Sequence, residues 1–286
     1  MELQWPLMLF TTLLCASAGL FAAQGVYAVL GRGAKAQMSS LITSFVLMVI
    51  SGIAVFLHLQ HWERIFNGFG HITSGITQEL IAIVILCIMM VIVFVSIRRN
   101  DVVPKWVGIV SVIVCAGLVV VCGMSYMMPA RPAWNNALQI LSLAGLAFAA
   151  GAGLFALLDA SEEDGVLHGT YTLVATAVNA VFSCAFLASM ASAVGSFTDV
   201  GYYFDPNHPT VAVENAASYS PFSSGSMGFS IAVIALVLIA VAFAFYGKKS
   251  KNWKVAGAGV ALSAVIGGLL LRVVFMYAGG SVFLFY

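Results

Sequence analysis

Eight long runs of apolar residues follow one another along the chain, separated by short polar segments. A helix needs about 20 consecutive apolar residues to cross a bilayer, and each run is long enough to do so. None shows the ten-residue alternation of a membrane β-barrel strand. The pattern therefore predicts eight spanning helices, with approximate limits 6–30, 38–57, 77–97, 104–127, 137–158, 167–194, 229–246 and 253–277.

The composition agrees with this pattern. Hydrophobic residues make up 62% of the 286 residues and charged residues only 8%, whereas a soluble domain carries roughly 25% charged residues. The expected fold is an all-α integral membrane protein, a bundle of eight transmembrane helices in a single domain over residues 1–286. We find no internal repeat.

The first apolar run could be taken for a signal peptide, because Ala16-Ser17-Ala18 resembles a cleavage site. No basic residue precedes the run, however, and it continues to Leu30, which is too long for a typical signal sequence. We therefore expect it to be retained as the first helix.

The basic residues predict the orientation of the bundle. Cytoplasmic loops are enriched in Lys and Arg. The segments after the odd-numbered helices hold nine of these residues, and the segments after the even-numbered helices hold only Arg64 and Arg131. The nine are Arg32, Lys35, Arg98, Arg99, Lys105, Lys248, Lys249, Lys251 and Lys254. Both termini are then expected to be extracytoplasmic, together with segments 56–76, 128–136 and 195–228.

Two ionisable residues flank the expected outer segment 56–76. His58 directly follows the second apolar run, and its imidazole, with an ordinary pKa of about 6.5, can either exchange a proton or end the helix at the headgroup level. Glu79 opens the third run, and a carboxylate at membrane depth is a candidate functional group. It could instead be an acid favoured by the helix dipole. Gln78 beside it could hold a carbonyl oxygen.

Three more polar residues are expected at the same level of the bundle. Arg272 interrupts the last apolar run towards its outer end. It could form a salt bridge with Glu79, or it could bind a quinone oxygen or an anionic group of a partner. Tyr126 and Arg131 come at the outer end of the fourth run. Trp134 is expected in the interfacial aromatic belt.

The chain offers no obvious site for a metal or a haem. Its five cysteines lie singly inside apolar runs, without a Cys-x-x-Cys pair. A haem between helices needs two histidines at one depth, but His58 and His168 are expected at opposite ends of the bundle. The remaining histidines fall in loops, so neither haem nor iron–sulfur cluster is expected in this chain.

Several short motifs resemble the membrane-anchor subunit of the anaerobic dimethyl sulfoxide reductase family of molybdoenzymes. The similar segments extend over the full length, although the region between the sixth and seventh runs and the acidic segment 159–164 are less similar. They are Glu2-Leu-Gln-Trp-Pro-Leu-Met-Leu-Phe-Thr11, Leu57-His-Leu followed by Arg64-Ile-Phe-Asn67, Gln78-Glu79, the stretch from Tyr126 to Trp134, and Arg272-Val-Val-Phe.

The resemblance implies a function. Such anchors lie in the bacterial cytoplasmic (inner) membrane as multi-pass proteins. They oxidise menaquinol and pass its electrons to a four-cluster iron–sulfur subunit, which lies with a molybdopterin catalytic subunit on the extracytoplasmic face. Applied here, the resemblance assigns quinol oxidation to His58 and Glu79. Gln78, Tyr126, Arg131 and Arg272 are further candidates for binding the quinol.

Two other functions stay open at this stage. One is a small-solute membrane transporter, although no paired broken helices or repeated halves are seen. The other is a quinone-linked anchor of the polysulfide-reductase type, which would use similar chemistry. The sequence does not identify the terminal electron acceptor, because an anchor subunit does not touch it.

Overall fold

Among the residues that it describes, the computed structural model has eight helices long and apolar enough to cross a membrane, which confirms the predicted helical bundle. It describes residues 4–57, 61, 67, 70–161, 163–198, 200–201, 210–211 and 216–282. The helices are α1 (Trp5–Val29), α2 (Gln37–Phe56), α3 (Gly75–Asn100), α4 (Lys105–Met124), α5 (Ala137–Asp159), α6 (Gly165–Ala193), α7 (Met227–Ser250) and α8 (Trp253–Tyr277).

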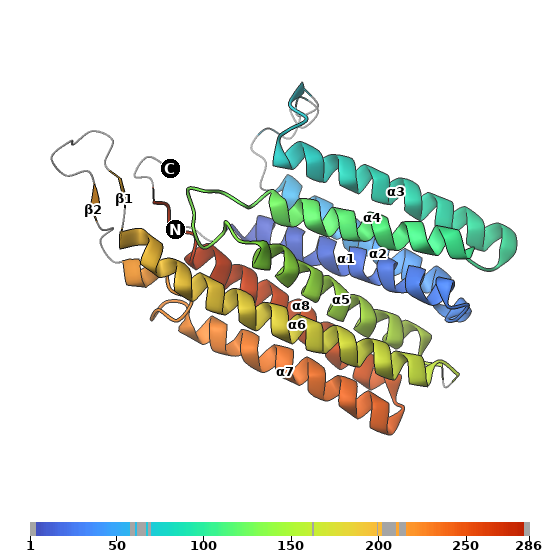
Figure 1. Cartoon of the computed structure of the whole chain (residues 1–286). Helices are drawn as coiled ribbons and strands as arrows, with labels where there is room; N and C mark the ends of the chain where they lie inside the picture. The colour runs from blue at the N-terminus through green and yellow to red at the C-terminus, as the bar shows by residue number, and fades with distance from the viewer. Residues whose placement is uncertain are drawn as a thin grey trace.

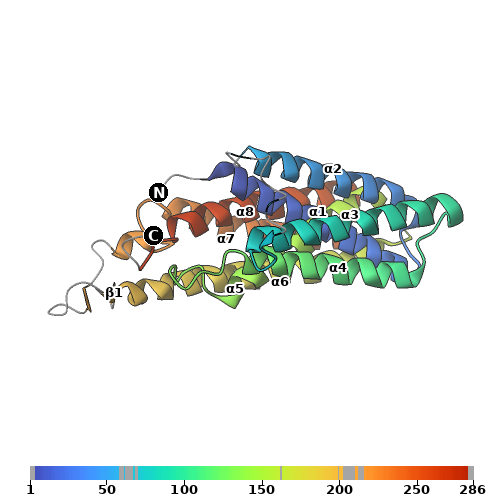
Figure 2. The same ribbon diagram turned by 90° about the horizontal axis from the view of Figure 1, so that it is seen from above.

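The helices run side by side along one axis (Figures 1 and 2). Helices α1 to α4 form one half of the bundle and α5 to α8 form the other, and α1 packs against α5 between them. Both ends of the described chain lie at the same end of the bundle, which we call the terminal end. The opposite end, called the basic end, carries Arg32, Arg98 and Lys248.

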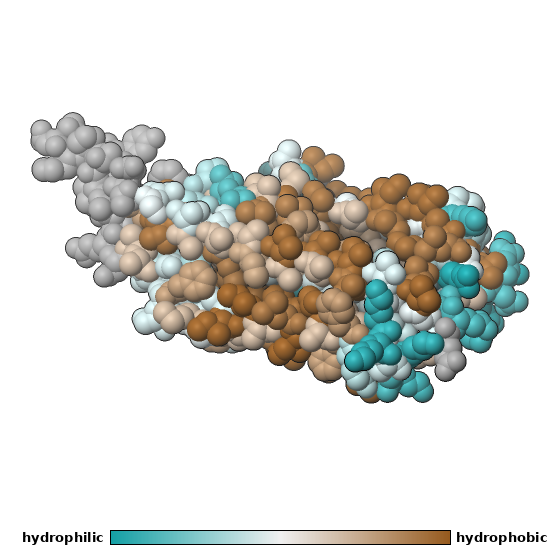
Figure 3. Space-filling model, turned by 60° about the horizontal axis from the view of Figure 1, so that its bottom comes forward, coloured by the Kyte–Doolittle hydropathy of each residue, from teal (hydrophilic) through white to brown (hydrophobic). Residues whose placement is uncertain are grey.

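On the face shown in Figure 3 the middle of the bundle is mostly apolar, and strongly hydrophilic residues gather at one end. Large apolar side chains such as Ile42, Ile88 and Ile231 are exposed on α2, α3 and α7. Scattered apolar residues are normal on soluble proteins, but a broad apolar surface is not. The structure therefore agrees with a multi-pass membrane protein.

Two glycines allow α1 and α5 to approach each other closely. A Cβ atom added at Gly19 would lie 1.8 Å from the carbonyl oxygen of Ala147, and one added at Gly151 would lie 2.2 Å from the backbone of Gly19. Small residues at such crossings are the usual means of packing helices in a membrane, where lipid is as apolar as the side chains. The contact between the two halves of the bundle depends on these positions.

The helix limits differ from the expected ones where apolar character and helical structure do not coincide. Helix α4 ends at Met124 rather than near residue 127, because the chain turns at Ser125 and Tyr126 before Pro129. Helix α7 extends to Ser250, beyond the expected residue 246. Its last turn is polar and includes Lys248 and Lys249, which can lie at the lipid headgroups without ending the helix.

The described parts of the long segment between α6 and α7 contain short elements. They are the 3₁₀ helices Val194–Thr198 and Ala216–Tyr219 and a two-stranded antiparallel sheet of β1 (Val200–Gly201) and β2 (Thr210–Val211). This agrees with the absence of long helical periodicity in the sequence. All of them lie beyond the terminal end of the bundle (Figure 1).

We predict that Gly19→Ala and Gly151→Ala each destabilise the protein by about 1–3 kcal/mol, because the added methyl group meets backbone atoms of the facing helix. Gly117→Ala is the control, since nothing lies within 4 Å of an added Cβ there. Alanine should stabilise that helix by roughly 0.5–1 kcal/mol. Thermal unfolding in detergent measures both effects. Equal melting temperatures for all three variants would contradict the proposed close contact.

Candidate functional site

A cavity of about 380 Å³ lies near the terminal end, between α1, α2, α3 and the segment after α4. Phe56 and Ile76 line it and are also exposed, so it opens to the apolar exterior between α2 and α3. Its lining is apolar except for Glu79 and a few hydroxyl groups. The lining residues are Leu7, Phe10, Gly52, Val55, Phe56, Ser74, Gly75, Ile76, Glu79, Leu80, Ile83, Ser125, Tyr126 and Met128.

Glu79 is the carboxylate of this cavity. It lies in the second turn of α3 and is only 8% exposed. The hydroxyl group of Ser125 lies 2.5 Å from Glu79 Oε1 and 3.0 Å from the carbonyl oxygen of Cys122. Because the hydroxyl has one proton, it donates to one of these oxygens at a time.

The position of Glu79 follows from how α3 meets α4. Gly75 lies so close to the end of α4 that an added Cβ would be 2.8 Å from Cβ of Ser125. This contact holds the first turn of α3 against Ser125, and Glu79 follows one turn later on the same face. The sequence identified Glu79 but not Ser125, which lies 46 residues away and is of a residue type too common in membrane helices to attract attention.

Arg272 brings a buried positive charge close to the carboxylate. Its side chain is only 4% exposed, and its guanidinium carbon lies 5.0 Å from the ring centre of Phe275 and 5.7 Å from that of Tyr126. Among the described residues Nη2 has no hydrogen-bond partner, and no ion pair joins Arg272 to Glu79. The charges of the two residues are nevertheless close enough to interact. Arg272 does not line the cavity, so its positive charge acts on Glu79 from behind the cavity wall.

Tyr126 lines the same cavity as Glu79. Burial raises the pKa of its phenol well above the usual range, and the negative charge of Glu79 raises it further. The hydroxyl group therefore stays protonated at physiological pH and can donate a hydrogen bond. Its ring packs edge-on against Phe275, with 6.0 Å between the ring centres, which fixes the direction of the phenol.

Arg131 has a different position from the one expected for a quinol ligand. Its Nη1 donates to the carbonyl oxygen of Gly279 at 2.8 Å, and the guanidinium lies 4.3 Å from the ring centre of Trp134. Trp134 is buried rather than in an exposed aromatic belt, stacks on Phe275 and donates from Nε1 to its carbonyl oxygen at 2.7 Å. Partial burial lowers the pKa of Arg131. Arg131 is absent from the cavity lining and attaches the C-terminal segment to the bundle.

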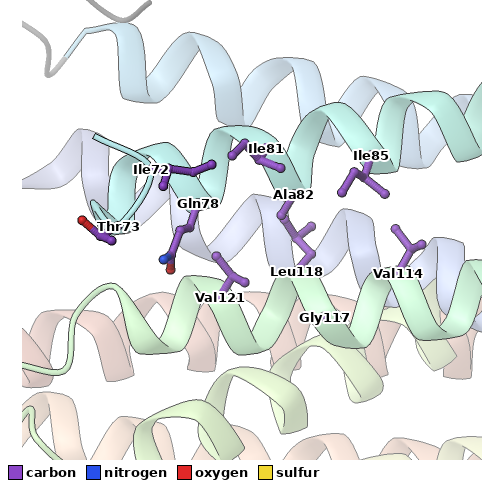
Figure 4. Close-up of a pocket in the computed structure, with 10 residues that line it drawn as sticks. All are labelled: Ile72, Thr73, Gln78, Ile81, Ala82, Ile85, Val114, Gly117, Leu118 and Val121. Atoms are coloured by element: carbon purple, nitrogen blue, oxygen red, sulfur yellow. The ribbon is translucent and has the colours of Figure 1, made fainter. Parts of the chain in front are cut away.

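Gln78 and Glu79 line different hollows. Consecutive residues of a helix point about 100° apart, and Gln78 faces a groove of about 610 Å³ between α3 and α4 (Figure 4). The groove is apolar apart from Gln78 and Thr73 at one end. Gln78 therefore does not line the cavity that holds Glu79.

His58 lies outside the described residues, so its distance from Glu79 is not part of the structure. Val55 and Phe56 are the last two residues of α2, and both line the cavity.

Within the described ranges no group of three or more His, Cys, Asp or Glu side chains could hold a metal ion. Both ring nitrogens of His168 have partners, Tyr27 and Asp159, which leaves neither for a haem iron.

We predict that Arg131→Gln lowers the free energy of unfolding by about 1.5–3 kcal/mol, because a charged hydrogen bond to Gly279 is lost. Arg98→Gln, at an exposed position in the last turn of α3, is the matched control and should have little effect. Chemical denaturation in detergent measures the difference. A similar stability for both variants would mean that the contact with Gly279 does not hold the C-terminal segment.

Comparison with known proteins adds no family to this description. No protein-family model matches the chain, and no curated protein sequence matches it significantly. The function must therefore be argued from the motifs and from the chemistry of the cavity.

Proposed function

We propose that this protein is the membrane-anchor and quinol-oxidising subunit of a molybdenum-dependent anaerobic reductase. In this proposal it oxidises menaquinol and passes the electrons to an iron–sulfur subunit bound at its terminal end. The observation that carries the proposal is the buried carboxylate of Glu79 in an apolar cavity that opens to the membrane. An intramembrane ionisable residue facing a cavity is a functional group by default.

Oxidation of a quinol releases two electrons and two protons from its two hydroxyl groups. Glu79 can take one of these protons, because its carboxylate side chain lines the cavity. Tyr126 lines the cavity and keeps its phenolic proton, so it can donate a hydrogen bond, and the buried positive charge of Arg272 lies nearby. Such donors stabilise the negative charge that develops on a quinol oxygen as its proton leaves.

The cavity suits a lipid-soluble ring. Its volume of about 380 Å³ lies within the roughly 300–1,000 Å³ of typical small-molecule sites. The wall is mostly aliphatic and aromatic, and its opening between Phe56 and Ile76 faces the apolar exterior. A quinol could enter there with its isoprenoid tail remaining among the lipid chains.

The second proton acceptor in the proposal is His58. Its role comes from the sequence, where it follows α2 directly, and from the resemblance to the anchor family. The electrons need an acceptor outside this chain, because its five cysteines are not clustered: two lie on α4 and one each on α1, α3 and α6. This requirement favours a partner that carries iron–sulfur clusters, bound near the cavity.

We predict that Glu79→Gln lowers quinol-dependent reduction by the assembled complex at least about 100-fold, because the amide cannot accept the proton. His58→Arg should have a similar effect. A dye that donates electrons directly to the partner subunits should still drive the reaction in both variants. Glu163→Gln is the matched control, since this acid is exposed at the basic end. Normal quinol oxidation by Glu79→Gln would refute the assigned role.

Co-purification separates this function from a transporter. Mild solubilisation of the native membrane should recover the chain together with a subunit that carries iron–sulfur clusters and one that carries molybdenum, both detectable by metal analysis. A small-solute transporter would be recovered without these metals, and that result would contradict the proposal.

A further inference from the structure

The groove between α3 and α4 is larger than the Glu79 cavity but has no part in the proposed reaction. Its volume is about 610 Å³. One wall comes from α3, where the lining residues from Gln78 to Ile85 have the spacing of a single helix face. The other wall comes from α4, where the lining residues from Val114 to Val121 have the same spacing. The groove is therefore formed by two facing helix surfaces.

Two small residues widen the middle of this groove. Helices α3 and α4 run in opposite directions, and the order of their lining residues places Ala82 opposite Gly117 (Figure 4). A Cβ atom added at Gly117 would meet nothing within 4 Å, so the space in front of it is empty. Ile85 in the wall is 44% exposed, which leaves the groove open to the apolar exterior. A lipid-borne molecule can therefore enter from the side.

The groove is short for its volume. Seven residues separate its ends on each helix, which corresponds to about 10 Å along the axis. Its volume nevertheless lies within the roughly 300–1,000 Å³ of typical small-molecule sites. A short, wide groove suits a ring better than one extended acyl chain.

The polar side chains of the groove lie at its terminal end. Gln78 is in the first turn of α3 with its amide directed towards α4, and Thr73 lies beyond it at the mouth (Figure 4). Among the described residues, no ionisable side chain lines the groove. A charged molecule would be left without a partner here. The groove therefore favours an uncharged molecule with an oxygen that accepts a hydrogen bond from Gln78 Nε2.

We propose that the α3–α4 groove is a second binding site for a quinone, separate from the Glu79 cavity. The ring lies between Ala82 and Gly117, one carbonyl oxygen accepts from Gln78 Nε2, and the isoprenoid tail stays among the lipid chains. Ala82 follows Gln78 by about 6 Å along the axis. This distance leaves room for half a ring, its oxygen and a hydrogen bond of about 2.9 Å.

The two sites differ in what they can do chemically. The Glu79 cavity contains a carboxylate that can take a proton, whereas the described lining of the groove contains no ionisable group. The groove can therefore hold the oxidised ring but cannot take protons from the reduced one. That the ring is a quinone rests on the proposed function. The preference for an uncharged ring with a carbonyl group rests on the groove alone.

Each site also has lining residues on a helix that the other site does not use. Residues in segment 52–56 of α2 line only the Glu79 cavity, and residues in segment 114–121 of α4 line only the groove. Chemical labelling of these two segments therefore reports the two sites separately.

Photolabelling tests the second site. The full chain in lipid nanodiscs is irradiated with an azidobenzoquinone that carries a short isoprenoid tail, and labelled residues are located by mass spectrometry. Segment 114–121 should be labelled. An excess of unlabelled quinone should lower this labelling at least about tenfold, whereas the same ring without carbonyl oxygens should not. Absence of label there, or label that quinone does not displace, would mean that the groove holds membrane lipid only and would overturn the inference.

Two glycines offer a matched pair of variants, because nothing lies within 4 Å of an added Cβ at either Gly117 or Gly52. Gly117→Leu fills the groove and should remove the displaceable label from segment 114–121 while that in segment 52–56 persists. Gly52→Leu fills the Glu79 cavity and should have the opposite effect. Loss of both labels in Gly117→Leu would indicate a single site and contradict the inference. Label in 114–121 without label in 52–56 of the wild-type chain would support the groove and count against the proposed function.

Gln78→Leu tests the hydrogen bond with little change in side-chain size. A hydrogen bond lowers the stretching frequency of a carbonyl group. Infrared difference spectra with a ¹³C-labelled quinone should therefore show a shifted carbonyl band in the wild-type chain that is missing in Gln78→Leu. The quinone concentration for half-displacement of the label in 114–121 should increase several-fold. An identical band and an unchanged concentration would refute the role of Gln78.

Discussion

The close approach of α1 and α5 is the constraint on which the rest of the bundle depends. At Gly19 and Gly151 the backbones of the two helices touch, so neither position has room for a side chain. In a membrane there is little hydrophobic drive to bring helices together, and such contacts gain their stability from dispersion and from close packing. Once α1 is fixed against α5, its other faces are available to α2, α4 and α8.

This central helix also shapes the candidate site. Leu7 and Phe10 of α1 form part of the cavity wall, while α3 and the end of α4 supply Glu79 and Ser125. The buried charge of Arg272 comes from α8, in the other half of the bundle. Groups that interact electrostatically are thus fixed on separate helices, and the packing of the two halves sets the distances between them.

Much of the fold could be read from the sequence, because a spanning helix needs a long apolar run and little else. The ends of α4 and α7 could not be read from the sequence. The chain turns at Ser125 although the residues there are still apolar, and α7 continues through Lys248 after its apolar run has ended. Glu79 stood out because a carboxylate is rare at membrane depth. Its partner Ser125 did not, because the contact joins two helices whose packing no local pattern reveals.

Neighbouring residues in the sequence also proved to have different surroundings. Gln78 and Glu79 were grouped as one site, but the helix turns them towards different hollows. Arg131 was expected among the quinol ligands, whereas in the structure it binds the backbone of Gly279 and does not line the cavity. Its position depends on how the C-terminal segment returns to the bundle, which is a tertiary property that a short motif does not encode.

The polar face of α2 has a consequence for the biogenesis of the protein. Helix α2 presents serines and a glutamine to α1 and large apolar side chains such as Ile42 and Ile53 to the outside, so its inner side is the more hydrophilic one. Alone in lipid, that side would face hydrocarbon. Insertion of α1 and α2 as a hairpin avoids this exposure, because Ser17 and Gln24 meet their partners as the pair leaves the translocon.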